Sequence, residues 1–228
     1  MLTAIIVAAG SSRRLGFDKL TARIAGAPVI AHAVGAFERT VSVTDIVVVA
    51  RADRLAEFKE LLGGFAKIRG VIAGGEQRHN SVQAGLEQLF ESTRFVAVHD
   101  AARPLVSSAE IEEVYAKAQT HGAAALAEPV RDTLKRAGSD LIVLESIDRQ
   151  DVYAMQTPQI FDRKLLEKAY VAIGPNQQAV TDEVSAVQLS GHKVALIENR
   201  EPNFKITYPR DLRLAESVLL ERARAGGL

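Results

Sequence analysis

Residues 3–19 read TAIIVAAGSSRRLGFDK, an apolar run that is followed by small residues and then by cations. The apolar run contains the β-branched residues Ile5, Ile6 and Val7, and is typical of a buried strand in a parallel sheet. Small residues let a ligand approach the backbone, and loop N–H groups together with cations favour a polyanion. The stretch therefore predicts a buried strand leading into a binding loop, with a nucleoside triphosphate as the first candidate ligand.

Two common phosphate-binding motifs do not match this loop. A dinucleotide fingerprint needs Gly-x-Gly-x-x-Gly, whereas the loop has only Gly10 and Gly16. A Walker A loop needs Gly-Lys-Ser/Thr, but Gly16 is followed by Phe-Asp. The pattern from Ala8 to Lys19, AAGxxxRLGxxK, instead resembles the signature loop of nucleotidyltransferases that join a sugar or polyol phosphate to a nucleotide. The simpler alternative is a strand-to-helix turn with solvated basic residues.

The composition sets limits on the class of protein. The chain has 228 residues, which fits one large α/β domain better than two small ones. Its 28 Lys and Arg balance its 28 Asp and Glu, which argues against bulk binding to nucleic acid or to a membrane surface. It has no cysteine, which excludes disulfides and thiolate metal sites and is compatible with the cytoplasmic location that we expect. We identify no signal peptide and no apolar stretch of membrane-spanning length.

Strand and helix patterns alternate through the first half of the chain. After the opening run we expect buried strands at 45–50, 67–72, 95–99 and 123–127, and helices at 28–37, 54–62, 80–90 and 107–119. This order predicts an α/β fold with a single doubly wound, mostly parallel sheet. Ligands of such sheets bind beyond the carboxyl ends of the strands. We therefore expect Ala8–Lys19, Gly74–Ser81 and His99–Pro104 to meet at one edge.

The alternation of strand and helix patterns is interrupted in residues 130–150. Two extended runs, 130–136 and 141–144, flank a Gly-containing turn and predict a β-hairpin. Because it interrupts the alternation, we expect it to project from the 1–228 domain as an arm. Its apolar side chains would need cover, for which a second subunit is the usual source, although an ordinary surface hairpin is the alternative.

The last third of the chain returns to the α/β pattern. We expect helices at 163–172 and 209–224, and strands at 193–197 and 204–207. Thr181 is the expected cap of a further helix, with acidic residues in its first turn.

The segment from His99 to Pro104 reads HDAARP and ends a strand at the expected ligand edge. Asp100 there could hold a substrate hydroxyl or Mg²⁺, and Arg103 could hold a phosphate. The alternative is a structural Asp–Arg pair at a strand end. An isolated histidine such as His99 is more often structural than catalytic.

With this hexapeptide, nearly the whole chain resembles the 2-C-methyl-D-erythritol 4-phosphate cytidylyltransferase family. The resemblance rests on the loop described above and on the order and spacing of short motifs, namely GGEQRHNSV at 74–82, HDAARP at 99–104, DTLK at 132–135, DR at 148–149, QTPQ at 156–159, TDE at 181–183 and NxKITxPxD at 203–211. It implies a Rossmann-like nucleotidyltransferase fold and a homodimer in which the arm reaches the neighbour's site.

The resemblance implies a reaction between two anions. The phosphate of methylerythritol phosphate attacks the α-phosphorus of CTP, and the products are CDP-methylerythritol and pyrophosphate. The nucleophile is already ionised, so the enzyme needs no general base but must align and neutralise the reactants. Mg²⁺ is the implied cofactor, bridging triphosphate oxygens.

Roles carry over by position in the motifs. The resemblance implies transition-state contacts at the α-phosphate from Arg14 and Lys19, and acceptor-phosphate contacts from Arg149 and Lys205. Residues implied to bind CTP are Ala8, Ala9, Gly10, Ser11, Ser12, Gly75, Glu76 and Ser81. Residues implied at the acceptor side are Asp100, Arg103, Thr133 and Thr181, with Asp100 also the candidate metal ligand.

The chain departs from the family pattern at a few positions. Asp18 and Leu20 flank Lys19 where the family usually has Pro and Gln, and Val152-Tyr153 replaces a Leu-Trp-like pair. Asp18 would place a carboxylate beside a triphosphate unless it points away or pairs with a cation. The alternatives to the implied activity are a cytidylyltransferase for ribitol 5-phosphate, which would share the CTP half of the site, and a non-catalytic nucleotide-binding module.

Overall fold

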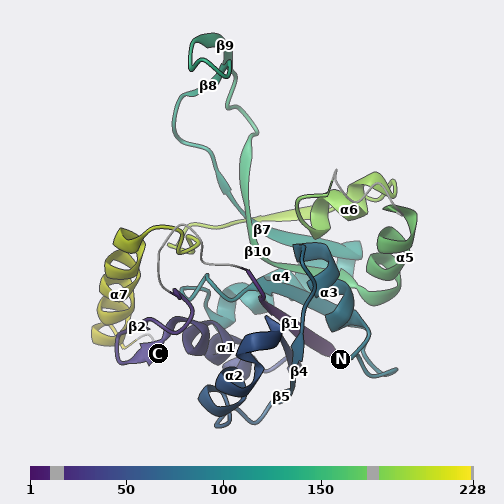
Figure 1. Cartoon of the computed structure of the whole chain (residues 1–228). Coiled ribbons are helices and arrows are strands. Elements are labelled where there is room, and N and C mark those ends of the chain that lie inside the picture. Colours follow the sequence, from purple (N-terminus) through teal and green to yellow (C-terminus); the bar gives the residue numbers. More distant parts are fainter. Residues whose placement is uncertain (11–17, 174–179, 227–228) are drawn as a thin grey trace.

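A computed structural model describes residues 1–10, 18–173 and 180–226 of the chain. Its centre is a 7-stranded sheet in the order β11-β7-β10-β6-β1-β4-β5 (Figure 1). The strands are β1 (Leu2–Ala8), β4 (Val43–Ala50), β5 (Ile68–Ala73), β6 (Phe95–Asp100), β7 (Ala123–Pro129), β10 (Tyr153–Asp162) and β11 (Ala195–Glu198). All neighbouring strands in this sheet run parallel except where β10 pairs with β6 and β7. The predicted mostly parallel sheet is confirmed.

Strand β10 was not among the predicted elements. It is 10 residues long and lies antiparallel between β6 and β7, with its register interrupted between Met155 and Gln159. The interruption contains Pro158, which cannot donate a backbone hydrogen bond to a neighbouring strand. A proline inside a polar run argues against a central strand, which is why the sequence pattern did not reveal this one.

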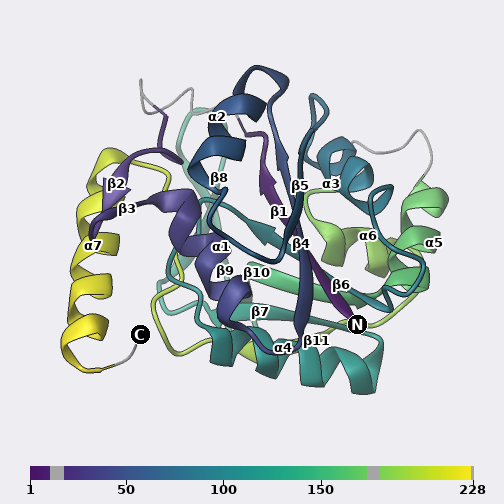
Figure 2. The same ribbon diagram turned by 90° about the horizontal axis from the view of Figure 1, so that it is seen from below.

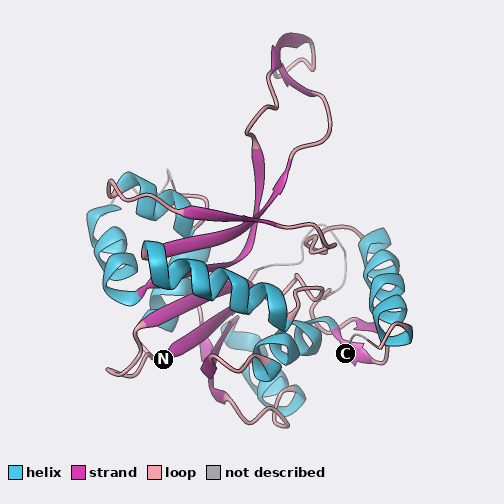
Figure 3. Cartoon of the chain, turned by 180° about the vertical axis from the view of Figure 1, so that it is seen from behind, coloured by secondary structure: helices cyan, strands magenta, loops and turns pink. Residues whose placement is uncertain are grey.

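Helices cover both faces of the sheet, as a doubly wound fold requires. One face packs against α1 (Val29–Arg39), α2 (Leu55–Leu61) and α4 (Ser108–His121), and the other packs against α3 (Arg78–Leu86), α5 (Arg163–Ile173) and α6 (Glu183–Leu189). Helix α7 (Pro209–Arg224) joins the first of these cores at its edge through Ala215 and Leu219. Along β1 the side chains alternate, with Ile6 in the first core and Ile5 in the second. Helix α3 lies in front of the sheet in Figure 1, and α4 lies in front in Figure 3.

Two small elements position the C-terminal helix. Strands β2 (Arg23–Ile24) and β3 (Ala27–Pro28) form a 2-stranded sheet beside α7, at the opposite end of the molecule from α5 and α6 (Figure 2). The single-turn helix η1 (Ala52–Arg54) joins β4 to α2. Glu216 of α7 accepts a hydrogen bond from the backbone N–H of Ala25 at 2.9 Å, which fastens the helix to this corner.

Most of the other predicted helices and strands are confirmed within a few residues, and α7 has the predicted bounds. Ser107 caps α4 in a reciprocal capping box with Glu110. Two details were wrong. The cap of α6 is Asp182 rather than Thr181, because the Asp182 carboxylate accepts from the N–H of Ser185 at 2.9 Å. Residues 204–207 form no strand.

The predicted arm is confirmed as a projecting hairpin (Figure 1). Strands β8 (Leu134–Ala137) and β9 (Val143–Ile147) form a separate 2-stranded sheet beyond the ends of β7 and β10. Its tip exposes an unusual apolar run, with Leu141 84%, Ile142 62%, Val143 59% and Leu144 65% exposed. In the single chain this run of aliphatic side chains has no cover.

Helix α3 approaches β1 closely, and Gly85 makes this approach possible. A Cβ at Gly85 would lie 2.7 Å from Cγ2 of Ile5. We predict that Gly85→Ala lowers the free energy of unfolding by about 1–2 kcal/mol, because overpacking outweighs the gain in helix propensity. Urea denaturation measures the change.

Gly64→Ala is the matched control, since nothing lies within 4 Å of a Cβ at that position. Its stability should change by less than about 0.5 kcal/mol. Equal stability of Gly85→Ala and the wild type would show that the α3–β1 contact can readjust.

Candidate active site

A cavity of about 750 Å³ opens at the carboxyl ends of β1, β4 and β6. The predicted meeting of the three loop segments at one edge is confirmed here. The cavity is lined by groups from all three and from the segment before α7, among them Ala8, Gly10, Lys19, Gly75, Asp100 and Lys205. Its size suits a nucleotide.

The glycines after β5 shape the wall of this cavity. A Cβ at Gly74 would lie 2.5 Å from Oγ of Ser81 and 2.9 Å from Cβ of Ala9, and a Cβ at Gly75 would lie 2.4 Å from Cβ of Asn80. Larger residues would therefore push α3 away from the end of β1. Gly74 therefore leaves room for Ala9 and Ser81 at the cavity wall, and Gly75 leaves room for Asn80.

Lys19 is held at the cavity by a neighbouring segment, since its Nζ donates to the carbonyl oxygen of Ile206 at 2.7 Å. Asp18, which precedes it, forms an ion pair with Arg54 and accepts from the N–H of Leu20 at 2.9 Å. The Asp18 carboxylate is thus neutralised by a cation, one of the two possibilities that the sequence left open. Leu20, the second departure from the family pattern, is 4% exposed and packs in the apolar core.

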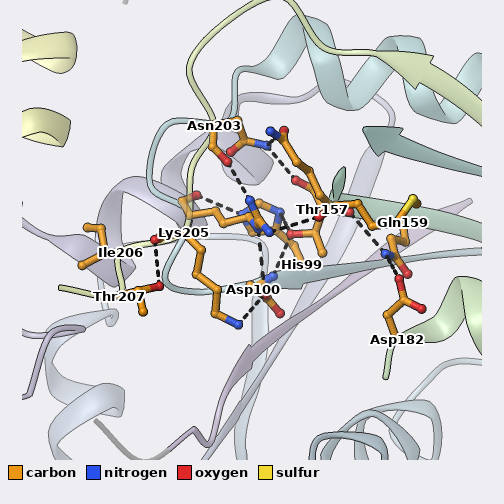
Figure 4. A network of polar contacts seen from close by, with 12 residues as sticks. His99, Asp100, Thr157, Gln159, Asp182, Asn203, Lys205, Ile206 and Thr207 are labelled. Carbon is orange, nitrogen blue, oxygen red and sulfur yellow. Dashed lines mark hydrogen bonds and ion pairs between the residues drawn. The ribbon is translucent and has the colours of Figure 1, made fainter. Parts of the chain in front are cut away.

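Asp100, at the end of β6, is surrounded by cations, of which Figure 4 shows Lys205. Its Oδ2 lies 2.9 Å from Nζ of Lys205, its Oδ1 lies 3.3 Å from Arg78, and Nε of Arg103 lies 3.9 Å from Oδ2. Burial by itself would raise the pKa of Asp100, but the charges of Arg78, Lys205 and Arg103 hold it well below the usual range. Asp100 is therefore an anion that orders cations from separate segments.

A second cavity, of about 420 Å³, adjoins the first and shares Arg78, Asp100 and Lys205 with it. Thr181 and Arg103 also line it. Arg103 donates through Nη1 to the carbonyl of Asn203 at 2.8 Å, while its buried Nε has no hydrogen-bond partner. The two cavities meet at the cations around Asp100, so ligands in them would face each other across this cluster.

The second cavity has a rigid polar floor. The side-chain oxygen of Gln156 accepts from Asn199 at 2.8 Å and from Asn203 at 3.1 Å, and Asn203 also donates to the carbonyl of Thr157 at 2.9 Å. Gln159 donates to Asp182 at 2.8 Å and so joins β10 to the start of α6 (Figure 4). These bonds fix the QTPQ segment as a structural support.

His99 has a structural environment. It is 0% exposed, its Nε2 lies 3.1 Å from the carbonyl of Arg103, and its Nδ1 lies 3.0 Å from Oγ1 of Thr157. The N–H of Asp100 donates to the same Thr157 oxygen at 3.1 Å, so that hydroxyl can donate to Nδ1. Burial lowers the pKa of His99 to about 4, which keeps the ring neutral.

The structure places the predicted site residues in three groups. Those that line the two cavities are Ala8, Ala9, Gly10, Lys19, Gly75, Glu76, Ser81, Asp100, Arg103, Thr181 and Lys205. Ser11, Ser12 and Arg14 lie outside the described residues. Thr133 and Arg149 are exposed on the arm and line neither cavity, and Arg149 donates to the carbonyl of Arg131.

The sequence did not single out Arg78 and Glu183 as site residues. Arg78 lines both cavities, and its Nη1 contacts both carboxylate oxygens of Glu183, at 2.6 and 2.8 Å. Both residues stood inside motifs quoted for the resemblance, but their motifs are far apart in the sequence. Only the fold brings the pair together.

Within residues 1–10, 18–173 and 180–226, no group of three or more His, Asp or Glu could hold a metal ion. The candidate ligand Asp100 already contacts Lys205 and Arg78 through its two oxygens. Among the described helices, none is long and apolar enough to cross a membrane.

Comparisons with known proteins agree on one family. Residues 2–221 match the family described as 2-C-methyl-D-erythritol 4-phosphate cytidylyltransferase. Proteins of that name from Pelotomaculum thermopropionicum and Halalkalibacterium halodurans are 38% and 37% identical, covering 99% and 97% of this chain and 99% and 98% of theirs. The crystal structure of 4-diphosphocytidyl-2C-methyl-D-erythritol synthase from Anaerococcus prevotii matches with a TM-score of 0.85 at 28% identity, covering 96% of each chain.

The buried His99 should make stability depend on pH. Its pKa is about 4 in the folded chain and about 6.5 when unfolded, so between these values only the unfolded chain binds the proton. Above about pH 6.5, His99 is neutral in both states and costs the folded chain no stability. As the pH falls from about 6.5 toward 4, the free energy of unfolding decreases by up to about 3 kcal/mol.

His99→Gln isolates this effect from the titration of carboxylates, because glutamine keeps a donor and an acceptor but does not ionise. We predict that, as the pH falls from 7 to about 4, the free energy of unfolding of the wild type decreases more than that of the variant. Denaturant unfolding at a series of pH values measures it, and parallel curves would contradict the prediction.

Proposed function

This chain belongs to the 2-C-methyl-D-erythritol 4-phosphate cytidylyltransferase family, and on that premise we propose that it transfers the cytidylyl group of CTP to 2-C-methyl-D-erythritol 4-phosphate. The products are CDP-methylerythritol, a precursor in isoprenoid biosynthesis by the non-mevalonate pathway, and pyrophosphate. The observation that carries the proposal is the pair of adjoining cavities that share Arg78, Asp100 and Lys205.

The geometry suits a reaction between two phosphates. CTP would occupy the larger cavity, with its base near Gly75 and Ser81 and its triphosphate near Gly10 and Lys19. The acceptor would occupy the smaller cavity, with its phosphate at Lys205. Its oxygen then attacks the α-phosphorus in line while pyrophosphate leaves.

Cations supply the catalysis in this proposal. The attacking phosphate oxygen is already ionised, so no side chain has to remove a proton. Lys19 and Arg14 would stabilise the negative charge that develops around the α-phosphorus. Lys205 is held by Asp100 at 2.9 Å and would orient the acceptor phosphate before attack.

We propose that Mg²⁺ would be bound together with CTP. When bound, it would neutralise negative charge on the triphosphate. Asp100 is the protein group that could contact it, at the cost of weakening a contact with a neighbouring cation.

A turnover assay that follows pyrophosphate release tests the function. We expect product with CTP and methylerythritol phosphate and little with ribitol 5-phosphate, since the family match does not favour the ribitol alternative. Absence of turnover with both acceptors would instead favour a non-catalytic nucleotide-binding module.

We further propose a homodimer in which each arm completes the neighbour's site. Thr133 and Arg149 are exposed in the single chain, and Leu141 to Leu144 leave an apolar tip uncovered. A two-stranded hairpin alone in water is only marginally stable, so packing against a second copy would support it. The partner's Arg149 would then reach the acceptor phosphate.

Removing the Lys19 side chain should affect chemistry more than binding. We predict that Lys19→Ala lowers kcat on the order of 10²–10³-fold while KM for methylerythritol phosphate changes little, because the cation acts on developing charge. Steady-state kinetics with both substrates varied provide the measurement.

Lys59→Ala is the control, since Lys59 is exposed on α2 and lines neither cavity. It should keep wild-type kinetics. Near wild-type kcat in Lys19→Ala would remove Lys19 from the catalytic role.

Mixing two inactive variants tests the arm. If Arg149 acts in the partner's site and Lys19 in its own, a dimer of Arg149→Ala and Lys19→Ala subunits has one doubly damaged site and one intact site. We predict recovery of up to about half of the wild-type activity per mixed dimer. Native mass spectrometry confirms that subunits have exchanged, and no recovery after exchange would show that Arg149 does not serve an independently working neighbouring site.

A further inference from the structure

A chain of polar contacts runs from the buried carboxylate of Glu183 to the cations that the two cavities share. Arg78, on the first turn of α3, contacts Asp100 through Nε and Nη2, both at 3.3 Å from Oδ1. On its other side, Nη1 contacts both oxygens of Glu183. Glu183 is 1% exposed and also accepts from the hydroxyl of Tyr170 at 3.0 Å. The chain therefore runs from α5 and α6 through α3 to the end of β6.

We infer that Glu183, supported by Tyr170, is a positioning residue for the transfer reaction, acting through Arg78 and Asp100 on Lys205. This inference rests on the proposed function, because the purpose of the chain is to orient the cation that would hold the acceptor phosphate.

The contacts divide the two oxygens of Asp100 between two cations. Arg78 uses Oδ1, and Lys205 uses Oδ2 at 2.9 Å. Glu183 holds Nη1 of Arg78, so that the guanidinium group contacts Asp100 only through Nε and Nη2, both at 3.3 Å. Without the negative charge of Glu183, Arg78 would have Asp100 as its remaining carboxylate contact and would compete there with Lys205.

Stability alone is a poor explanation for this pair, in which the side chain of Glu183 is 1% exposed and that of Arg78 is 27% exposed. Removing a carboxylate and a guanidinium from water is costly, and apolar residues of similar volume often stabilise a fold as well or better. A pair that ends at two ligand cavities is better explained by positioning. Tyr170 supports the pair by donating to Glu183. Burial and the charge of Glu183 raise the pKa of the Tyr170 hydroxyl, so this hydroxyl stays protonated and remains a donor.

Glu183→Gln is the principal test, because it keeps the shape of the side chain and removes its charge. Wild-type turnover with CTP and methylerythritol phosphate is measured first, and its absence would refute the proposed function itself. In an active protein, we expect Glu183→Gln to lower kcat/KM for the acceptor about 10–100-fold, with Kd for CTP changed less than about 3-fold.

Tyr170→Phe provides a graded second variant that should fold even if Glu183→Gln does not. It removes one hydrogen bond to Glu183 and leaves the charge, so we expect a loss of about 2–5-fold in the same parameter. Glu110→Gln is the control for a buried carboxylate outside the site, with Glu110 9% exposed in the cap of α4. It should change thermal stability only.

A double-mutant cycle shows whether Glu183 acts through Lys205. If it does, Lys205→Ala alone and the double variant with Glu183→Gln should have nearly equal kcat/KM for the acceptor, because the second change has nothing left to disturb. If the loss of kcat/KM in the double variant equals the product of the two single losses, the inference is overturned. It is also overturned by Glu183→Gln and Tyr170→Phe variants that lose stability but keep wild-type kinetics.

Discussion

The carboxylate of Asp100 is the anchor on which the candidate site depends. Three cations from distant parts of the sequence converge on it: Arg78 from α3, Arg103 from the turn after β6, and Lys205 from the segment before α7. Like charges this close repel each other, and their attraction to an anion between them offsets that repulsion. Because the cations also stabilise the ionised form, they hold the pKa of Asp100 well below its usual range. The protein can therefore hold a cationic site in place before any phosphate arrives.

The backbone around Asp100 explains why the cluster has a fixed geometry. The Asp100 N–H donates to Thr157, whose hydroxyl lies 3.0 Å from the ring of buried His99, and that ring contacts the carbonyl of Arg103. The antiparallel strand β10 supplies Thr157, so the strand that interrupts the parallel sheet is also the one that braces the site. The same strand continues into the arm, which connects the arm mechanically to the floor of the second cavity (Figure 1).

Sequence patterns predicted the parts of the fold that depend on short-range periodicity. Apolar runs marked β1, β4 and β6, turn residues marked the hairpin, and the rule for parallel sheets brought Gly75, Asp100 and Lys19 to one edge. The patterns failed where long-range contacts decide. Pro158 concealed β10. Asp182 rather than Thr181 caps α6, and Gln159 also contacts Asp182. Residues 204–207 resemble a strand, but Ile206 accepts from Lys19 and donates to the carbonyl of Ala102 instead of pairing with a neighbouring strand. The Arg78–Glu183 pair could not be foreseen because its partners are 105 residues apart.

The departure of this chain from its family pattern at Asp18 is also explained by paired charge. A carboxylate at position 18 would oppose a triphosphate, yet its ion pair with Arg54 neutralises it at the edge of the cavity. Asp100 differs in kind, because its compensating cations are themselves the groups that would hold the substrates. When phosphates approach, each of these cations gains a second anion, and charge-assisted hydrogen bonds to phosphate can form without first gathering the donors. Folding has therefore already brought the like charges together before the substrates bind. In this way the site is preorganised for a reaction between two anions.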